Sequence, residues 1–207
     1  MTRLGILLSG RGSNFLAIDD AVRRGELHAE IAVVISNQPE AAGLERARER
    51  GLPALLLPHR GKRREEHDRL VLDALREYRV DWVCLAGWLR IAGPTLVDAF
   101  PQQIVNIHPS LLPSFPGLEA QRQAFEHGVK VSGCTVHLVD AGLDTGPIVL
   151  QRAVDVATAG SAAEVAARIL REEHSAYVEG LRRLLAGGYK VAGRRLLFPD
   201  EEISKIS

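Results

Sequence analysis

The chain opens with Leu4-Gly5-Ile6-Leu7-Leu8-Ser9-Gly10-Arg11-Gly12-Ser13-Asn14, an apolar run that passes directly into a glycine-rich loop. A short apolar run bounded by glycine is typical of a buried strand. The stretch from Asn14 to Arg24 that follows has the amphipathic pattern of a helix. Together they predict a strand, a loop and a helix, which is how a βαβ unit begins.

The same alternation continues through the first half of the chain. Further strands are predicted at Ile31 to Ile35, Pro53 to Leu57, Val80 to Ala86 and Gln103 to Ile107, with helices at Ala41 to Arg50 and Arg63 to Tyr78. The strands are continuously apolar, so both faces of the sheet should be covered. We therefore expect an α/β fold with a Rossmann-like, mainly parallel sheet and helices on both faces.

After Gly117 the pattern changes. We predict a short helix at about Leu118 to His127 and then two strands, Val131 to Val139 and Ile148 to Val156, which extend the same sheet. Gly160-Ser161-x-x-Glu164 predicts a capping box at the start of a long helix that ends near Leu185. The tail resembles a closing hairpin, and without a linker or repeat the chain, 1–207, should form a single domain.

Bulk composition excludes several classes of protein. The 26 basic and 26 acidic residues give a formal charge of zero, so neither nucleic acid nor an anionic membrane is expected as a partner. The N-terminus has no signal-peptide pattern and no eighteen apolar residues run together, which predicts a soluble, cytoplasmic protein. Cys84 and Cys134 lie in apolar strand-like runs without Cys-x-x-Cys spacing, so buried free thiols are expected.

The loop Ser9-Gly10-Arg11-Gly12-Ser13-Asn14 joins the first strand to the first helix. Its glycines allow a close backbone approach, and a helix N-terminus offers free N–H groups to a phosphate. Phe15 replaces the third glycine of the dinucleotide fingerprint, and strand two ends in Ser36-Asn37-Gln38 without an acidic residue for a ribose. A monophosphate cradle is favoured, and a plain tight turn is the alternative.

Asn106-Ile107-His108-Pro109-Ser110 ends a central strand at the edge where parallel sheets bind ligands. Residues i and i+2 of a strand share a face, so Asn106 and His108 should lie side by side. An amide donor and an imidazole suit acyl transfer, which needs a donor for the oxyanion and a proton shuttle. Asp144 could orient a protonated His108, although its glycine-rich loop also suits a turn-stabilising aspartate.

Three further residues could serve the same site. His137 falls on one face with Thr135 and is either structural or a support for the site. Glu173 lies on the apolar stripe of the long helix, where it either sits at the edge in water or meets a ligand. Arg90 follows strand four at the ligand edge and suits a carboxylate or a loop carbonyl. The histidines have no metal-ligand spacing, so no metal is expected.

Six motifs in this order carry a family resemblance. They are Ser9-Gly10-x-Gly12-Ser13-Asn14, Leu85-Ala86-Gly87-x-x-Arg90, Asn106-Ile107-His108-Pro109-Ser110-Leu111-Leu112-Pro113, Phe115-Pro116-Gly117, Val136-His137 and Asp144-x-Gly146-Pro147. Over nearly the whole chain they resemble the phosphoribosylglycinamide formyltransferase family of purine synthesis. The Asn-x-His-Pro-Ser-Leu-Leu-Pro string is shared by the wider folate-dependent formyltransferases, so it indicates the chemistry more firmly than the substrate.

The resemblance implies the formyltransferase fold and formyl transfer from 10-formyltetrahydrofolate, as a co-substrate, to glycinamide ribonucleotide. It implies a phosphate- and ribotide-binding half at about 1–100 and a catalytic and folate-binding half at about 101–207. The implied catalytic residues are Asn106, His108 and Asp144; the implied ribotide-binding residues are Gly12, Ser13, Asn14, Leu170 and Glu173; and the implied folate-binding residues are Arg64, Leu89, Arg90, Ile91, Ala92, Asp140, Ala141, Gly142 and Leu143.

Alternatives stay open at this point. Another formyltransferase or a formyl-folate hydrolase could use the same scaffold, and a ribotide-binding regulatory module would keep the sheet without catalysis. An NAD-dependent redox enzyme is disfavoured because the ribose carboxylate is missing. Small-molecule substrates are the expected partners, and a homodimer is possible.

Overall fold

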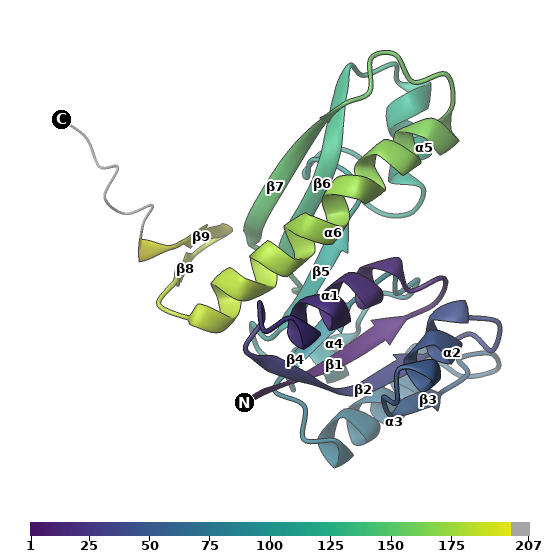
Figure 1. Ribbon diagram of the computed structural model, residues 1–207, viewed down its shortest axis with the longest axis vertical. Helices are drawn as coiled ribbons and strands as arrows, with labels where there is room; N and C mark the ends of the chain where they lie inside the picture. The colour runs from purple at the N-terminus through teal and green to yellow at the C-terminus, as the bar shows by residue number, and fades with distance from the viewer. Residues whose placement is uncertain (200–207) are drawn as a thin grey trace.

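The computed structural model describes residues 1–199, and within them a single mixed sheet of nine strands runs through the molecule (Figure 1). The strands are β1 (Thr2–Leu8), β2 (Ala29–Ser36), β3 (Ala54–Leu56), β4 (Trp82–Leu85), β5 (Ile104–His108), β6 (Val131–Leu138), β7 (Ile148–Asp155), β8 (Lys190–Ala192) and β9 (Arg195–Leu197). The helices are α1 (Ser13–Arg23), α2 (Ala42–Glu49), α3 (Arg64–Glu77), α4 (Pro94–Val97), α5 (Ala120–Glu126) and α6 (Ala162–Ala186).

The strand order is β3-β2-β1-β4-β5-β6-β7-β9-β8. The first five strands in this order are all parallel, and β5–β6 is the first antiparallel pair. β1 lies between β2 and β4, so the sheet is built outward in both directions from the first strand, as in a doubly wound fold. The prediction of a mainly parallel α/β sheet is confirmed.

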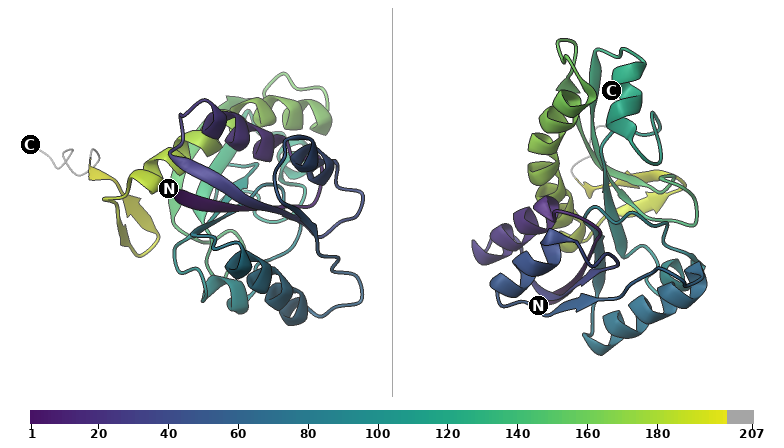
Figure 2. Two further views of the ribbon diagram at one scale, coloured as in Figure 1. Left: turned by 60° about the horizontal axis from the view of Figure 1, so that its bottom comes forward. Right: turned by 90° about the vertical axis from the view of Figure 1, so that its right-hand side faces the viewer.

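Helices cover both faces of the sheet, as the apolar strands predicted (Figure 2). One core cluster joins the strands to side chains of α1 and α6, including Phe15, Ile18 and Tyr177. A second cluster on the other face contains Val71 and Leu75 of α3 together with α4. Cys84 and Cys134 are buried free thiols, as expected. None of the helices in the described chain is long and apolar enough to span a bilayer.

Some local predictions were wrong or incomplete. The short helix α4 was not predicted, although Pro94 stands at its first position, which proline favours. The helix expected from Leu118 begins at Ala120, because Leu118 is exposed and Glu119 takes a left-handed conformation. At the start of α6, Ser161 caps Glu164 N–H as predicted, but the Glu164 carboxylate accepts from Gly160 N–H instead of from Ser161.

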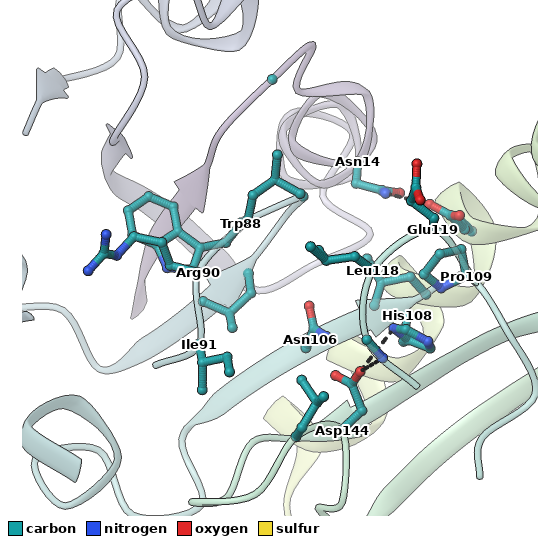
Figure 3. A pocket seen from close by; sticks show the side chains of 18 of the residues that line it. Asn14, Trp88, Arg90, Ile91, Asn106, His108, Pro109, Leu118, Glu119 and Asp144 are labelled. Carbon is teal, nitrogen blue, oxygen red and sulfur yellow. Dashed lines mark hydrogen bonds and ion pairs between the residues drawn. The ribbon is translucent and has the colours of Figure 1, made fainter. Parts of the chain in front are cut away.

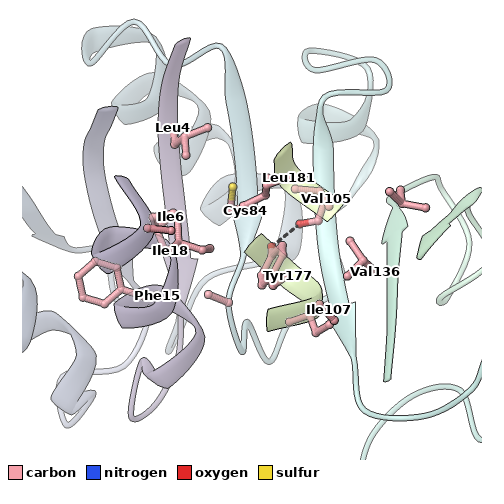
Figure 4. Packing of buried hydrophobic residues seen from close by; sticks show 14 of the residues in the cluster. Leu4, Ile6, Phe15, Ile18, Cys84, Val105, Ile107, Val136, Tyr177 and Leu181 are labelled. Carbon is pink, nitrogen blue, oxygen red and sulfur yellow. Dashed lines mark hydrogen bonds between the residues drawn. The ribbon is translucent and has the colours of Figure 1, made fainter. Parts of the chain in front are cut away.

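Tyr177 links the long helix to the centre of the sheet (Figure 4). Its ring is completely buried, and its hydroxyl lies 3.1 Å from the carbonyl oxygen of Leu85 and 3.0 Å from that of Val105. These carbonyls belong to neighbouring strands, β4 and β5. The Tyr177 hydroxyl therefore joins α6 to both β4 and β5.

Tyr177→Phe should lower the free energy of unfolding by about 1–2 kcal/mol, because it removes a buried hydroxyl that bonds to the sheet while keeping the ring. Urea unfolding followed by circular dichroism measures the change. Tyr78→Phe, at a half-buried ring directly after α3, removes the same hydroxyl group elsewhere in the fold and is the control. Equal stability of the two variants would contradict this role for Tyr177.

Candidate active site

A cavity of about 1320 Å³ lies at the carboxyl ends of β1, β4 and β5 (Figure 3). The loop after β1, the segment after β4, the end of β5, the β6–β7 loop and one face of α6 all line it. Both halves of the chain thus contribute to one hollow. The loop after β1 and the end of the Asn106 strand therefore meet at the carboxyl ends of the parallel strands.

Asn106 and His137 face each other directly across the β5–β6 pair. His137 is 2% exposed, and its Nδ1 lies 2.9 Å from the carbonyl oxygen of Leu138, so this nitrogen carries the proton. Its Nε2 then accepts from Asn106 Nδ2 at 3.1 Å. Burial lowers the pKa of His137, which favours this neutral form. His137 therefore fixes the Asn106 amide and leaves the second amide N–H for a ligand.

His108 lies on the same face as Asn106 and is 4% exposed. Its Nε2 is 2.8 Å from the carbonyl oxygen of Phe115, and its Nδ1 is 3.4 Å from Asp144 Oδ2. A carbonyl and a carboxylate can only accept, so both ring nitrogens are placed to donate. The long Nδ1 contact leaves that N–H available to share with a substrate oxygen.

The position of the Asp144 carboxylate is set by a left-handed backbone conformation and by the backbone amide of Gly117. Its φ is 53°, and Oδ2 accepts from Gly117 N–H at 2.8 Å, while Oδ1 lies 3.7 Å from His137 Nε2. The turn-stabilising role is filled by Asp140, whose Oδ1 accepts from Gly142 N–H at 3.0 Å and from the Thr145 hydroxyl at 2.7 Å. Asp144 is thus directed at the two histidines instead of at its own turn.

The glycine-rich loop presents only part of itself to the cavity. Gly10, Arg11 and Asn14 line it, whereas Ser13 lines a separate hollow between α1 and α6. Gly12 has a φ of 73°, and a Cβ added there would lie 2.8 Å from the Cα of Gly43. The predicted residues Gly12 and Ser13 therefore form the turn beneath the cavity, and their side-chain positions do not face it.

Glu173 of α6 is 6% exposed, so the alternative that placed it in water at the edge of the apolar stripe is wrong. Its Oε2 accepts from Asn14 Nδ2 at 2.7 Å, and burial raises the pKa of the carboxyl. Within residues 1–199, the Asn14 Oδ1 atom is buried without a partner. Leu170 lies one turn earlier and also lines the cavity. This end of the hollow therefore holds one unsatisfied polar atom beside a buried carboxyl, a setting that suits a polar ligand.

The other end of the cavity combines apolar and basic side chains. Its lining includes Arg64, Leu89, Arg90, Ile91, Ala92, Asp140, Gly142 and Leu143. Leu89 is 63% exposed and Leu143 is 49% exposed, so both present apolar surface that a ligand in the cavity can cover. Ala141 alone among the predicted folate residues is absent from the lining. Over the described chain, no three His, Cys, Asp or Glu side chains are grouped as metal ligands.

Comparison with known proteins identifies the family. The family model described as formyl transferase matches residues 2–181. The chain belongs to the formyl transferase family. It is 38% identical over 186 residues to phosphoribosylglycinamide formyltransferase of Bacillus subtilis, with 89% of this chain and 95% of that protein covered. It is 43% identical to the trifunctional purine biosynthetic protein adenosine-3 of Drosophila melanogaster, but spans only 14% of that protein.

Solved structures give the same result. Glycinamide ribonucleotide transformylase 1 from Symbiobacterium toebii superposes with a TM-score of 0.93 at 49% identity, covering 96% of this chain and 94% of that one. A formyltetrahydrofolate deformylase from Pseudomonas syringae has a TM-score of 0.89 at 28% identity, covering 95% of this chain and 65% of that one. The predicted family and formyltransferase fold are confirmed.

Sequence reasoning did not assign three parts of the cavity. The sequence does not decide the role of His137, because its position opposite Asn106 depends on the register of an antiparallel pair. Arg11 lines the cavity but was treated only as part of the loop. The Gly117 amide that holds Asp144 leaves no trace in side-chain chemistry.

Glu173→Gln should make the protein more stable at pH 7.5 but not at pH 4. Folding raises the pKa of this carboxyl above its ordinary value of 4.5, so wild type loses stability as pH rises through the folded value. Glutamine has no charge to bury and keeps an acceptor for Asn14. Urea unfolding at both pH values measures the difference, with the half-buried neighbour Glu172→Gln as control. A stability difference that does not change with pH would contradict the assignment.

Proposed function

We propose that this protein transfers the formyl group of 10-formyltetrahydrofolate to the amine of glycinamide ribonucleotide, a step of purine biosynthesis. The observation that carries the proposal is the group of Asn106, His108 and Asp144 at the middle of one cavity. The polar end, with Asn14 and Glu173, lies on one side of this group, and the apolar and basic end lies on the other. Two different substrates can therefore meet at it.

The polar end suits the ribotide. Free N–H groups at the start of α1 and the turn made by Gly12, Ser13 and Asn14 offer a place for the phosphate. Arg11 adds a positive charge at the same loop. Glu173 and the unpaired Asn14 Oδ1 are acceptors for ribose hydroxyls or the amine, and Leu170 packs beside them.

The opposite end suits the folate donor. The exposed apolar side chains of Leu89, Ile91 and Leu143 offer contact area for flat rings. Arg64 and Arg90 supply positive charge for carboxylates, and the Asp140 to Asp144 loop closes the site beside His108. Ala92 completes the wall. Ala141 contributes through its place in the loop.

The reaction follows from these positions. The ribotide amine attacks the formyl carbon, a C–N bond forms, and the carbonyl electron pair moves to oxygen. The free N–H of Asn106 and the imidazolium of His108 stabilise this oxyanion. Collapse of the intermediate breaks the bond to the folate nitrogen, which takes a proton that the attacking amine has lost. Asp144 orients His108 through its contact with Nδ1 and offers a route for that proton.

The second candidate is hydrolysis of the formyl donor, which the similarity to a formyltetrahydrofolate deformylase favours. The two activities differ in one requirement. A transferase needs the ribotide amine as acceptor, whereas a hydrolase uses water. Purified protein given formyl folate should release tetrahydrofolate only when glycinamide ribonucleotide is present. Release at the same rate without the acceptor would replace this proposal with the hydrolase.

Asn106→Ala should lower kcat by about 10² to 10³, because removing one preorganised oxyanion donor raises the barrier by roughly 3 kcal/mol. Binding of formyl folate should change little, since the amide acts on charge that develops only during the reaction. Steady-state kinetics and equilibrium titration measure the two quantities. Gln103→Ala, just before the same strand, is the control. Unchanged turnover of Asn106→Ala would remove this residue from the mechanism.

Other expectations remain proposals. The cytoplasm is the expected location, small molecules are the expected partners, no metal is expected, and a homodimer is possible. Light scattering of the purified protein would give its oligomeric state.

A further inference from the structure

Residues 87–93 form one wall of the cavity without regular secondary structure. This segment, called here the wall segment, follows β4 and carries Leu89, Arg90, Ile91 and Ala92 into the folate end. Such a segment costs conformational entropy to order, so something must hold it. Polar and aromatic contacts hold it at three points, and two of these come from adjacent residues of α3, His67 and Asp68.

The first anchor is an aromatic stack. His67 is completely buried, and its ring lies parallel to that of Trp88, with centroids 5.8 Å apart and planes 19° apart. His67 Nε2 donates to the carbonyl oxygen of Leu57 at 2.8 Å, which fixes the ring plane. The His59 ring lies edge-on to that of His67, with centroids 6.1 Å apart. The Trp88 side chain of the wall segment is thus stacked on a histidine whose ring orientation is fixed.

The second anchor is a carboxylate. Asp68 is 2% exposed, and its Oδ2 accepts from Gly93 N–H at 2.8 Å. Burial raises the pKa of this carboxyl, while Arg64 and Arg90 act in the opposite direction. Gly93 is closely fitted, because a Cβ added to it would lie 2.4 Å from the same oxygen. The C-terminal end of the wall segment is therefore held where the Gly93 N–H can bind the buried Asp68 carboxylate.

The third anchor connects the wall segment to the glycine-rich loop. Ser9 Oγ accepts from Leu89 N–H at 2.9 Å and donates to Asn37 Oδ1 at 2.7 Å. Leu89 thus has a fixed backbone although its side chain is 63% exposed. The wall segment is tied on both sides of its cavity-facing residues, and α3 also sends Arg64 into the cavity one turn before the two anchors.

We propose that His67 and Asp68 are positioning residues for the folate donor: through Trp88 and Gly93 they set the place of the wall segment on which the donor packs. The proposal rests on the formyl-transfer function proposed above. Neither side chain lines the cavity, so both act through the wall segment. Losing an anchor should weaken binding of the donor and leave the ribotide end unaffected.

Asp68 permits a sharp test because positioning and charge predict opposite effects. Asp68→Ala removes the acceptor for Gly93 N–H, so KM for formyl folate should rise about tenfold, which corresponds to about 1.4 kcal/mol. Asp68→Asn removes the same negative charge near Arg64 and Arg90 but keeps an acceptor oxygen, so this KM should stay the same or fall. KM for glycinamide ribonucleotide should change less than about twofold in both variants. Asp73→Ala, exposed on the same helix, is the control.

Gly93→Ala tests the anchor from the wall side without changing α3. Its methyl group would displace the Asp68 oxygen, so KM for formyl folate should rise as in Asp68→Ala. The double variant should be no worse than either single one, because both remove one interaction. If Asp68→Ala does not fold, Gly93→Ala alone decides the question.

His67→Ala and His67→Phe separate the ring from its polar atoms. In a Trp82→Phe background, Trp88 is the one tryptophan left in the sequence, so its fluorescence reports the wall segment. Titration with formyl folate should show weaker binding for His67→Ala and wild-type binding for His67→Phe, which keeps a flat ring on Trp88.

Two results would overturn the inference while leaving formyl transfer intact. One is an unchanged KM for formyl folate in Gly93→Ala and in the folded variants that lose an anchor; lowered melting temperatures would then mark a purely structural role. The other is an equal rise of KM for both substrates. Absence of acceptor-dependent transfer in the wild type would instead reject the proposed function itself.

Discussion

The antiparallel pairing of β5 with β6 is the constraint on which the site depends. It turns a parallel sheet into a mixed one and sets Asn106 opposite His137 and His108 opposite Thr135. Side chains directly opposite on such a pair share a face, so the amide meets the one imidazole able to orient it. A shift of β6 by a single residue would move His137 and Thr135 to the other face of the sheet, away from Asn106 and His108.

Most of the fold follows from patterns along the sequence, and most of the site does not. Apolar runs and amphipathic stretches predicted the strands and helices from β1 to β5 because each pattern depends on local geometry. Asn106 and His108 could be paired from strand periodicity alone. His137 could not, since its role arises from cross-strand register, and neither could Gly117, whose contribution to Asp144 is a backbone amide. Asp144 was distinguishable from Asp140 only once the turn bonds were known.

Three buried ionisable side chains in and beside the candidate site lower the stability of the fold. Glu173, His137 and Asp68 are buried ionisable side chains, and burial disfavours the charged form of each. The molecule tolerates them because each has a defined partner: Asn14, Asn106 and the Gly93 amide. Two large apolar clusters and the Tyr177 bridge supply the stability that offsets this. Such a distribution is expected where polar groups are retained for a ligand.

The close approach of Gly12 to Gly43 makes the two ends of the cavity unlike in character. Backbone touches backbone there, and Gly43 N–H also donates to the carbonyl oxygen of Gly10 at 3.0 Å. The proposed phosphate-binding turn is thus packed closely against the first turn of α2. On the proposed folate side the wall segment is instead held by the side chains of His67, Asp68 and Ser9. The fit of the ribotide should therefore depend on backbone packing, whereas the fit of the donor should depend on a few buried side chains, so side-chain substitutions outside the cavity should alter donor selectivity more readily than ribotide selectivity.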